Sequence, residues 1–268
     1  MTSEVQQQFE LIENEADLQE FYNNNKAVDW ICFDTEFIGE RRYHTLLCLI
    51  QVATPSGFFM IDSLKIENLK PFFQLIEDPN ILVITHAGDN DYRLLNAVGG
   101  VVPKNVFDIQ LAAGFLGYKY PVSFRKLVDN ELGVRLSKRY TVADWEKRPL
   151  APKALKYALD DVLYLYPVYE KLMKKLEKEN RVEWVAEENK LWERPENYQQ
   201  HPYREALKSN LILNLKPQQQ VFLMRLYVWR EDQARQKNYS KEMILPHKLL
   251  SSIVKGIKSG KAALKSNR

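Results

Sequence analysis

Acidic side chains recur at patterned spacings in three separate stretches of this sequence. The pattern consists of Asp34 and Glu36 in FDTEF, Asp91 in THAGDNDYRLL, and Tyr157 with Asp161 in KYALDDVLYL. Carboxylate oxygens are the hard ligands that small divalent cations prefer, and hydrolysis of a phosphodiester bond needs one or two such cations. The residue types therefore predict a metal-dependent hydrolytic site assembled from three elements.

The first two stretches also have structural interpretations. Asp34 and Glu36 occupy positions i and i+2 of an expected strand, so both point to one face and could bind one ion, or they could mark the strand's exposed end. Asp91 could cap the helix that follows, although Asp89 is the better cap by position. His86 ends a strand, where ligand sites often form in α/β sheets, but it could equally be a buried, hydrogen-bonded histidine.

The third stretch is a helical pair. Tyr157 and Asp161 share one helical face at i and i+4, and spacing does not exclude Asp160 at i+3. A tyrosine beside a metal-bound water can orient that water or assist its deprotonation. The same pair could also be the core edge and the wet side of an ordinary amphipathic helix. The complete set of residues is therefore stronger evidence for a catalytic site than any one of them.

The elements that must position these residues follow from the apolar pattern. AVDWICFDTEF, LLCLIQVAT and GFFMID predict three strands, and their short links favour an antiparallel meander. ILVITHA predicts a fourth strand, DNDYRLLNAV a helix that ends at Gly99 and Gly100, and NVFDI a fifth strand. Strand–helix–strand order implies parallel pairing, so the sequence predicts an α/β fold with a mixed sheet flanked by helices.

Helical patterns dominate the two ends of the chain. Residues 9–23 have helical apolar spacing, and from Ser123 onward most segments are helical. The long amphipathic run PKALKYALDDVLYLYPVYEKLMKKLEKEN is expected to kink or break at Pro167. Residues 190–203 carry two prolines and little periodicity, which indicates a linker, and helical runs resume after it.

Composition indicates a cytoplasmic protein without a membrane partner. The chain has 268 residues, 45% of them hydrophobic, and no apolar run long enough to span a bilayer. The polar, acidic N-terminus lacks the regions of a signal peptide. Cys32 and Cys48 lie inside apolar strand-like runs, so we expect two buried thiols and no disulfide framework.

The net charge of +3 conceals an asymmetry between the two parts of the chain. Residues 201–268 contain 14 Lys and Arg against 4 Asp and Glu, whereas residues 1–200 contain 24 against 31. A basic tail beside an acidic body favours binding to a polyanion, most simply a nucleic acid. The alternative is a solvated helical surface that happens to be basic.

At these residues the chain resembles a known family. The order D-x-E, HAG-x-x-D and Y-x-x-x-D resembles the DEDD exonuclease superfamily of the tyrosine subtype. The wider blocks FDTEFIGERRYHTLLCLIQVAT, THAGDNDYRLL, VFDIQLAAGFLGY and RYTVADWEKRPL…LKYALDDVLYLYPVYEKL are similar to the ribonuclease D family. The resemblance covers roughly residues 28–178.

The resemblance implies an RNase H-like fold and 3′→5′ hydrolysis that releases nucleoside 5′-monophosphates. It also implies two divalent cations, Mg²⁺ or Mn²⁺, held by four ligands: Asp34, Glu36, Asp91 and Asp161. Tyr157 would position the attacking water, and the Y-x-x-x-D pattern selects Asp161 over Asp160. Three further residues would bind the substrate near its 3′ end: Thr35, Phe37 and His86. Asp108 is expected to cap a helix and Asp144 to stabilise a loop.

The C-terminal part is similar to the first helices of an HRDC domain, a small helical nucleic-acid-binding module. GIKSGKAALKSNR departs from that pattern, so the module is truncated or a variant. The alternative is a helical cap on the catalytic domain with Leu223, Leu226 and Trp229 in its core. The expected organisation is an exonuclease domain at residues 1–183, a linker at 184–203 and an all-helical HRDC-like segment at 204–268.

The sequence therefore predicts a metal-dependent 3′→5′ exoribonuclease that processes the 3′ ends of tRNA or other structured RNA. RNA is favoured over DNA only by the neighbouring blocks and the HRDC-like segment. One alternative is a 3′→5′ DNA exonuclease of the proofreading or Werner type, and another is a catalytically silent RNA-binding protein. The intact carboxylate set argues against the silent protein, because a cluster of like charges is costly to keep. The sequence does not indicate an oligomeric state.

Overall fold

The computed structural model describes residues 9–136, 144–199 and 202–256. The chain forms two compact units, the first made of Met1–Ile38 with Leu47–Tyr198 and the second of Gly39–Leu46 with Gln199–Arg268. The first unit therefore extends to Tyr198. It includes residues that the sequence analysis assigned to a linker at 184–203.

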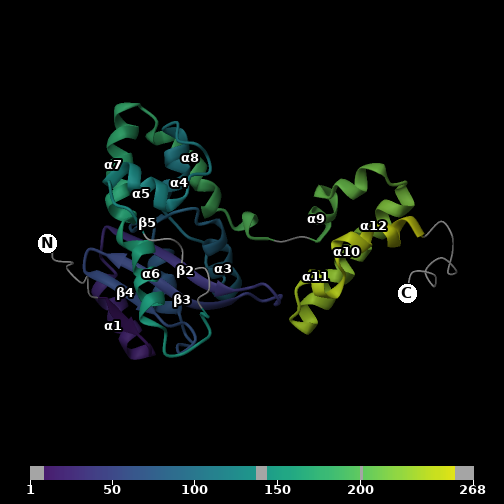
Figure 1. Ribbon diagram of the computed structural model, residues 1–268, viewed down its shortest axis with the longest axis horizontal. Helices are drawn as coiled ribbons and strands as arrows, with labels where there is room; N and C mark the ends of the chain where they lie inside the picture. Colours follow the sequence, from purple (N-terminus) through teal and green to yellow (C-terminus); the bar gives the residue numbers. More distant parts are fainter. Residues whose placement is uncertain (1–8, 137–143, 200–201, 257–268) are drawn as a thin grey trace. The chain divides into compact units, whose positions relative to one another are not determined.

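Unit 1 is built on a six-stranded sheet (Figure 1) in the order β1-β4-β3-β2-β5-β6. Its strands are β1 (Glu10–Ile12), β2 (Trp30–Ile38), β3 (Leu46–Thr54), β4 (Gly57–Ile61), β5 (Leu82–Thr85) and β6 (Val106–Asp108). β3 and β4 pair antiparallel, whereas β5 pairs parallel with both β2 and β6. The predicted mixed sheet is confirmed. β4 begins two residues after the end of β3, so these two strands form an antiparallel hairpin, whereas a helix separates β5 from β6 and these two strands pair parallel.

Helices cover both faces of this sheet. They are α1 (Glu15–Asn25), α2 (Lys70–Ile76), α3 (Asp89–Gly99), α4 (Ile109–Phe115), α5 (Phe124–Leu132), α6 (Pro152–Leu163), α7 (Leu165–Lys178) and α8 (Val182–Asn189). On one face Phe33 packs in the same apolar cluster as Phe72 of α2 and Tyr92 of α3. On the other face Cys32 packs in a cluster with Val162 of α6. Alternate residues of β2 thus bury against different layers, as the two-residue period of a strand requires.

Local sequence signals end several of these helices as predicted. α3 ends at Gly100, whose φ of 72° lies in the left-handed region that glycine adopts without steric cost. The long amphipathic run is interrupted between α6 and α7, three residues before Pro167. Proline is tolerated in the first turn of a helix because its missing N–H has no intrahelical acceptor there, so the predicted break is confirmed.

The prediction of one helix over residues 9–23 is wrong in its first part. Residues Glu10–Ile12 form β1, which pairs parallel with β4 and places Leu11 opposite Met60. The helix begins only at Glu15, where the side chain of Asn14 accepts a hydrogen bond from the Asp17 N–H at 2.9 Å. Residues 10–12 pair with the edge of β4, and the apolar spacing of residues 9–23 carries no information on that distant strand.

Unit 2 is helical and has a small core of its own. Its helices are α9 (Pro202–Lys208), α10 (Pro217–Lys237), α11 (Lys241–Ile244) and α12 (His247–Gly256), with a 3₁₀ turn at Asn210–Asn214. Leu223 of α10 is fully buried in this core and Leu226 packs against it, as predicted. Trp229 is 47% exposed, so its placement in a core was wrong. It is not among the buried residues of α10, which include Leu223, Tyr227 and Ala234.

Residues 39–46, between β2 and β3, belong to unit 2. The Tyr43 hydroxyl donates a hydrogen bond to Glu231 of α10, and the Nε of Arg235 donates to the same hydroxyl at 3.3 Å. The His44 N–H donates to the Asn238 side chain at 2.9 Å. These hydrogen bonds link residues 39–46 to the C-terminal half of α10 and its C-cap.

Both cysteines are buried and free, as predicted. Within the described ranges, no helix combines the length and the apolar character needed to cross a membrane.

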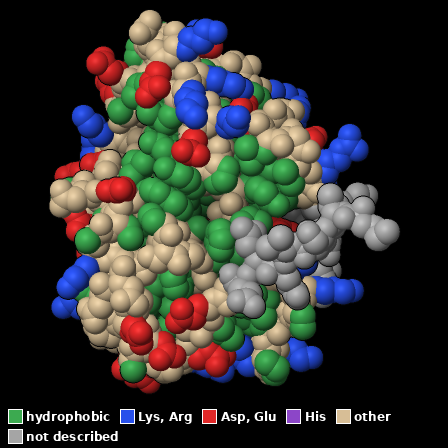
Figure 2. Space-filling model, turned by 90° about the vertical axis from the view of Figure 1, so that its left-hand side faces the viewer, with side chains coloured by type: hydrophobic (Ala, Val, Ile, Leu, Met, Phe, Trp, Pro, Cys, Tyr) green, Lys and Arg blue, Asp and Glu red, His purple; other side chains and the backbone are tan. Residues whose placement is uncertain are grey.

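Figure 2 shows one face of the molecule, where apolar side chains gather across the centre and charged side chains lie mostly around them. Apolar area of this kind is ordinary, because polar atoms are too few to cover a folded protein.

One buried ion pair fixes the segment that leads into α6. The Arg148 guanidinium donates from Nε to Asp62 at 2.6 Å, and from Nη2 to the other Asp62 oxygen at 2.7 Å. Nη2 also donates to the Cys48 carbonyl at 2.8 Å. The Asp62 side chain is 1% exposed, so its charge has little access to water and depends on this fork.

We expect Arg148→Ala to lower the free energy of unfolding by about 3–5 kcal/mol, because the buried Asp62 carboxylate loses its charged partner and keeps the Leu64 N–H as a donor. Urea unfolding measures the change. The double variant Arg148→Met with Asp62→Asn should lose less, since no charge remains buried. Lys65→Ala is the control: it removes an exposed pair with Glu13 and should cost less than about 1 kcal/mol. Equal losses in Arg148→Ala and Lys65→Ala would contradict the assignment.

Candidate active site

Three of the predicted ligands lie together at one place on the sheet. Asp34 and Glu36 project from the same face of β2, and Asp161 reaches them from α6, which packs against β2. One carboxylate oxygen from each of the three lies within 4.8 Å of the others. Spacing on the strand and on the helix predicted the faces, and the packing of α6 on β2 brings those faces together.

The fourth predicted ligand, Asp91, lies beside this group but is not part of it. It is in the first turn of α3 and is 7% exposed. The Thr35 hydroxyl, which projects from the opposite face of β2 to its neighbour Asp34, donates a hydrogen bond to Asp91 Oδ1. Thr35 therefore holds Asp91 in place.

The site concentrates negative charge on partly buried side chains. Burial raises the pKa of Asp34 well above its usual value, and the charges of Asp91, Asp161 and Glu36 raise it further. Asp34 thus interacts with each of the other three predicted ligands. Hard oxygen donors that repel each other at this separation fit a bound divalent cation, because its positive charge would relieve the repulsion.

Tyr157 lies one turn before Asp161 on α6 and is partly buried. Burial raises the pKa of its hydroxyl, and the neighbouring charges of Asp161 and Glu36, with a hydrogen bond to Asp161, raise it further. The phenol therefore stays protonated at neutral pH and acts as a hydrogen-bond donor. Asp160 points elsewhere on the helix: Tyr157 and Asp34 feel the charge of Asp161 and not that of Asp160, as the Y-x-x-x-D spacing implied.

The three predicted substrate-binding residues are more scattered. Thr35 is buried on Asp91, while Phe37, two residues further along β2, is 39% exposed. The His86 ring lies 3.0 Å through Nε2 from the Val122 carbonyl oxygen, with the Phe124 ring centroid 5.4 Å away. A role of these residues in substrate binding stays a prediction.

Asp108 shapes the turn that carries the HAG motif, a role that sequence reasoning missed. Its carboxylate caps α4 through the Gln110 N–H at 2.8 Å, as predicted. It also accepts the N–H groups of Ala87 at 3.0 Å and Gly88 at 3.1 Å. A Cβ on Gly88 would lie 2.5 Å from the Thr85 Oγ1, so only glycine fits there. Asp108 thus fixes the turn that leads into α3 and Asp91.

Two other expectations concerned acidic residues outside the site. Asp144 accepts the Glu146 N–H at 3.2 Å, which confirms its predicted role in a loop. Asp89 does not cap α3: the N-cap is Gly88, and the Asp89 carboxylate pairs with Arg93 at 2.5 Å instead. Because Asp108 fixes the turn at Gly88, the N-cap of α3 is Gly88 and Asp89 is the first residue inside the helix.

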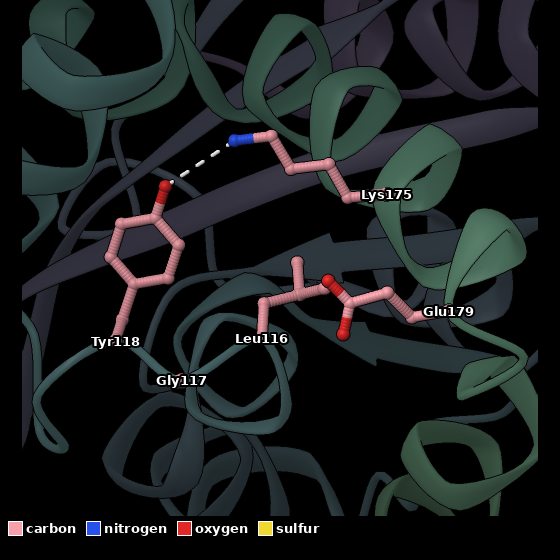
Figure 3. Close-up of a pocket in the computed structure, with 5 residues that line it drawn as sticks. All are labelled: Leu116, Gly117, Tyr118, Lys175 and Glu179. Atoms are coloured by element: carbon pink, nitrogen blue, oxygen red, sulfur yellow. Dashed lines mark hydrogen bonds between the residues drawn. The ribbon is translucent and has the colours of Figure 1, made fainter.

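A pocket of about 370 Å³ lies away from this site. It is lined by Leu116, Gly117, Tyr118, Lys175 and Glu179 (Figure 3). The Lys175 amine donates to both oxygens of the nearly buried Glu131 at 2.7 Å, and the Tyr118 hydroxyl also donates to Glu131. These polar groups already satisfy one another, so the pocket offers few free partners to a ligand.

The comparison with known families decides what the carboxylate site belongs to. Residues 9–177 match the sequence model of a 3′–5′ exonuclease family. The chain belongs to this family. Ribonuclease D of Bartonella henselae is 36% identical over 244 residues, which are 91% of this chain and 60% of that protein. The chain therefore spans about 60% of the length of this curated relative.

Solved structures of the exonuclease family agree with the fold. Escherichia coli RNase D, an exoribonuclease involved in structured RNA processing, superposes with a TM-score of 0.86 at 28% identity, over 92% of this chain and 66% of that chain. Brucella melitensis NrnC with bound Mg²⁺ superposes with a TM-score of 0.59 at 25% identity, over 71% of this chain and 90% of that chain. The RNase H-like exonuclease fold and the resemblance to ribonuclease D are confirmed.

The charge cluster makes the stability of the metal-free protein depend on pH. Burial raises the pKa of Asp91 from 3.8 to about 6. The folded protein then holds a proton that the unfolded chain releases, so the free energy of unfolding should fall as pH rises from about 4 to about 6. The loss should reach roughly 3 kcal/mol and persist above pH 6. Thermal unfolding in chelator at pH 4.5–7.5 measures it.

Asp91→Asn should make that pH profile less steep, because an amide does not titrate and can still accept the Thr35 hydroxyl, whereas Asp34, whose pKa is also raised, still titrates. Asp89→Asn, on a half-exposed side chain of the same helical turn, is the matched control and should keep the profile of the parent protein. A metal-free protein whose stability rises between pH 4.5 and 6.5 would contradict the buried carboxylate cluster.

Proposed function

We propose that this protein is a metal-dependent 3′→5′ exoribonuclease that releases nucleoside 5′-monophosphates. The observation that carries the proposal is the group formed by Asp34, Glu36 and Asp161, whose oxygens lie within 4.8 Å of one another in a chain of the exonuclease family. Tyr157 on the next turn of the helix completes the set. In a catalytically silent protein the repulsion between these carboxylates would destabilise the fold with no gain in metal binding or catalysis.

The carboxylates are proposed to hold two divalent cations, Mg²⁺ or Mn²⁺. Bound cations would provide hydroxide at neutral pH and stabilise charge on the leaving 3′ oxygen. Asp34, Glu36 and Asp161 supply oxygens from two elements, and Asp91 adds a fourth carboxylate held by Thr35. A solved structure of the NrnC relative contains Mg²⁺, which supports a hard divalent cation.

Tyr157 is proposed to orient the attacking water. Its raised pKa keeps the hydroxyl protonated, so it can donate a hydrogen bond to an oxygen atom but cannot take a proton as a base at neutral pH. In the structure that hydrogen bond goes to Asp161. We therefore assign Tyr157 to the geometry of attack and not to proton abstraction.

RNA is the proposed substrate class. The support is the likeness to E. coli RNase D, which acts in structured RNA processing, at 28% identity over 92% of this chain. Processing of tRNA or other structured RNA 3′ ends in the cytoplasm is the corresponding proposal. Phe37, exposed at the end of β2, and His86 are proposed to contact the 3′-terminal nucleotide.

Asp34→Asn should abolish turnover and leave the fold intact, because it removes one ligand and relieves repulsion. The assay is a digestion time course on matched 5′-labelled single-stranded RNA and DNA with Mg²⁺, Mn²⁺ or chelator. We expect a ladder that shortens from the 3′ end of RNA, needs metal, and disappears in the variant. The control is Asp160→Asn, which changes the residue next to Asp161 on α6 and should keep activity within about threefold of the parent protein.

Each other result of that assay has a stated meaning. Turnover retained by Asp34→Asn would contradict the metal-site assignment. Faster shortening of DNA would move the protein to the proofreading or Werner class. Tight RNA binding without cleavage of either strand would favour a silent binding protein.

Unit 2 is proposed to bind the nucleic acid backbone, in the manner of an HRDC-like module. Phe222, Arg225 and Trp229 recur at i, i+3 and i+7 on α10, and all three are exposed. Bases can stack on exposed aromatic rings, and a guanidinium can contact phosphate. This aromatic and basic face, together with the excess of Lys and Arg in residues 201–268, favours binding over a purely structural cap.

Trp229→Ala with Arg225→Ala should weaken binding of single-stranded RNA about tenfold or more, through loss of stacking. The slope of log K against log salt should fall in magnitude by about 0.7, because one phosphate contact is lost. Titrations at several salt concentrations, with catalysis blocked by chelator, measure both. Lys178→Ala, an exposed charge at the end of α7, is the charge-matched control. An unchanged slope in the double variant would show that α10 is structural only.

A further inference from the structure

One buried side chain of the sheet has no hydrogen-bond partner. Gln51 of β3 is fully buried, and neither its amide nitrogen nor its amide oxygen is bonded to any described residue. Asn189 has one unpaired amide nitrogen, but its oxygen accepts the Asp108 N–H. A buried amide without partners is costly, so such a group in a folded protein calls for a partner that the protein atoms do not provide.

Gln51 faces the same side of the sheet as the carboxylate site. On β3, Ile50 and Val52 pack in the cluster that contains Phe33, whereas Ala53 packs in the cluster that contains Cys32. Side chains alternate along a strand, so Gln51 shares the face of Ala53 and Asp34 shares the face of Cys32. The two residues therefore project into the same layer.

Gln51 and Asp34 also lie at similar heights along their strands. β2 and β3 are neighbours in the sheet, and the seven residues between them are too few for a crossover, so the two strands form an antiparallel hairpin. Asp34 is the fifth residue of nine in β2, and Gln51 is the sixth of nine in β3. Opposite or diagonal positions in such a pair place Cβ atoms about 4.5–8 Å apart, within reach of a glutamine side chain.

The helix over this face is the one that completes the site. α6 packs against β2 and against β4, which lie on either side of β3 in the sheet order. Figure 1 shows α6 crossing this part of the sheet. Tyr157 and Asp161 belong to that helix, so Gln51 faces the layer of the fold from which the predicted metal ligands come.

We propose that Gln51 is a positioning residue of the metal site, whose amide hydrogen bonds, directly or through one buried water, to the Asp34 carboxylate when a divalent cation is bound. The inference rests on the metal site of the proposed function. A metal-bound carboxylate is ionised and accepts charge-assisted hydrogen bonds. A bridging water would also donate to the Gln51 amide oxygen and so satisfy both unpaired atoms. Groups that orient metal ligands in this way strengthen metal binding.

Gln51→Met separates this role from a structural one. Methionine has a similar size and no amide, so the metal-free protein should keep its melting temperature or gain a few degrees. Affinity for Mn²⁺, measured by calorimetric titration of the full chain after chelation, should fall about tenfold or more. The rise in melting temperature on adding Mn²⁺ should shrink in parallel. Gln51→Leu is a second variant that tests the same point with a different shape.

Leu49→Met is the matched control, because it changes a fully buried side chain of the same strand without removing a polar group. It should bind Mn²⁺ as the parent protein does. Mn²⁺ affinity within twofold of the parent in both Gln51 variants overturns the inference. A parent protein that binds Mn²⁺ but shortens no RNA contradicts the proposed function alone, and the affinities still decide the role of Gln51.

Discussion

Mutual repulsion between partly buried carboxylates is the constraint on which the rest of the structure depends. Asp34 has a raised pKa because burial and three neighbouring carboxylates all disfavour its charge. Nothing in the packing of β2 against α6 requires acidic side chains there, and apolar residues would stabilise that contact more. The site is therefore a local cost that the surrounding core must offset.

The surroundings of the site hold the charges at close range instead of letting them separate. Thr35 donates to Asp91, and Asp108 accepts the two N–H groups that shape the turn before α3. The Asp62–Arg148 pair anchors the segment that leads into α6, which carries Asp161. Each predicted ligand thus comes from an element whose position is fixed by contacts within the protein itself. Such preorganisation suits the proposed cation site, because small displacements of its ligands would change affinity and geometry together.

Several of the site's supports are visible only in three dimensions. Thr35 was expected near the substrate, yet its hydroxyl is buried on Asp91, since the residue between two ligands on a strand must face the other layer. Trp229 was placed in a helical core by one interpretation of the sequence and is exposed, since α10 buries the face that carries Leu223, Tyr227 and Ala234. The sequence did not single out Gln51, because a role for a glutamine in an apolar strand is suggested only by its burial and its lack of hydrogen-bond partners among the described residues.

The sequence by itself indicated most element types and the mixed sheet, and its family resemblance indicated the five residues of the candidate site. Those features follow from short-range periodicity and from motifs whose spacing reflects one strand or one helical turn. Tertiary structure alone decided that residues 10–12 pair with β4, that Asp108 shapes the turn before α3, and which carboxylates approach within 4.8 Å. These depend on contacts between segments far apart in the chain. Periodicity fixes the face on which a side chain lies, but only packing fixes what lies opposite that face.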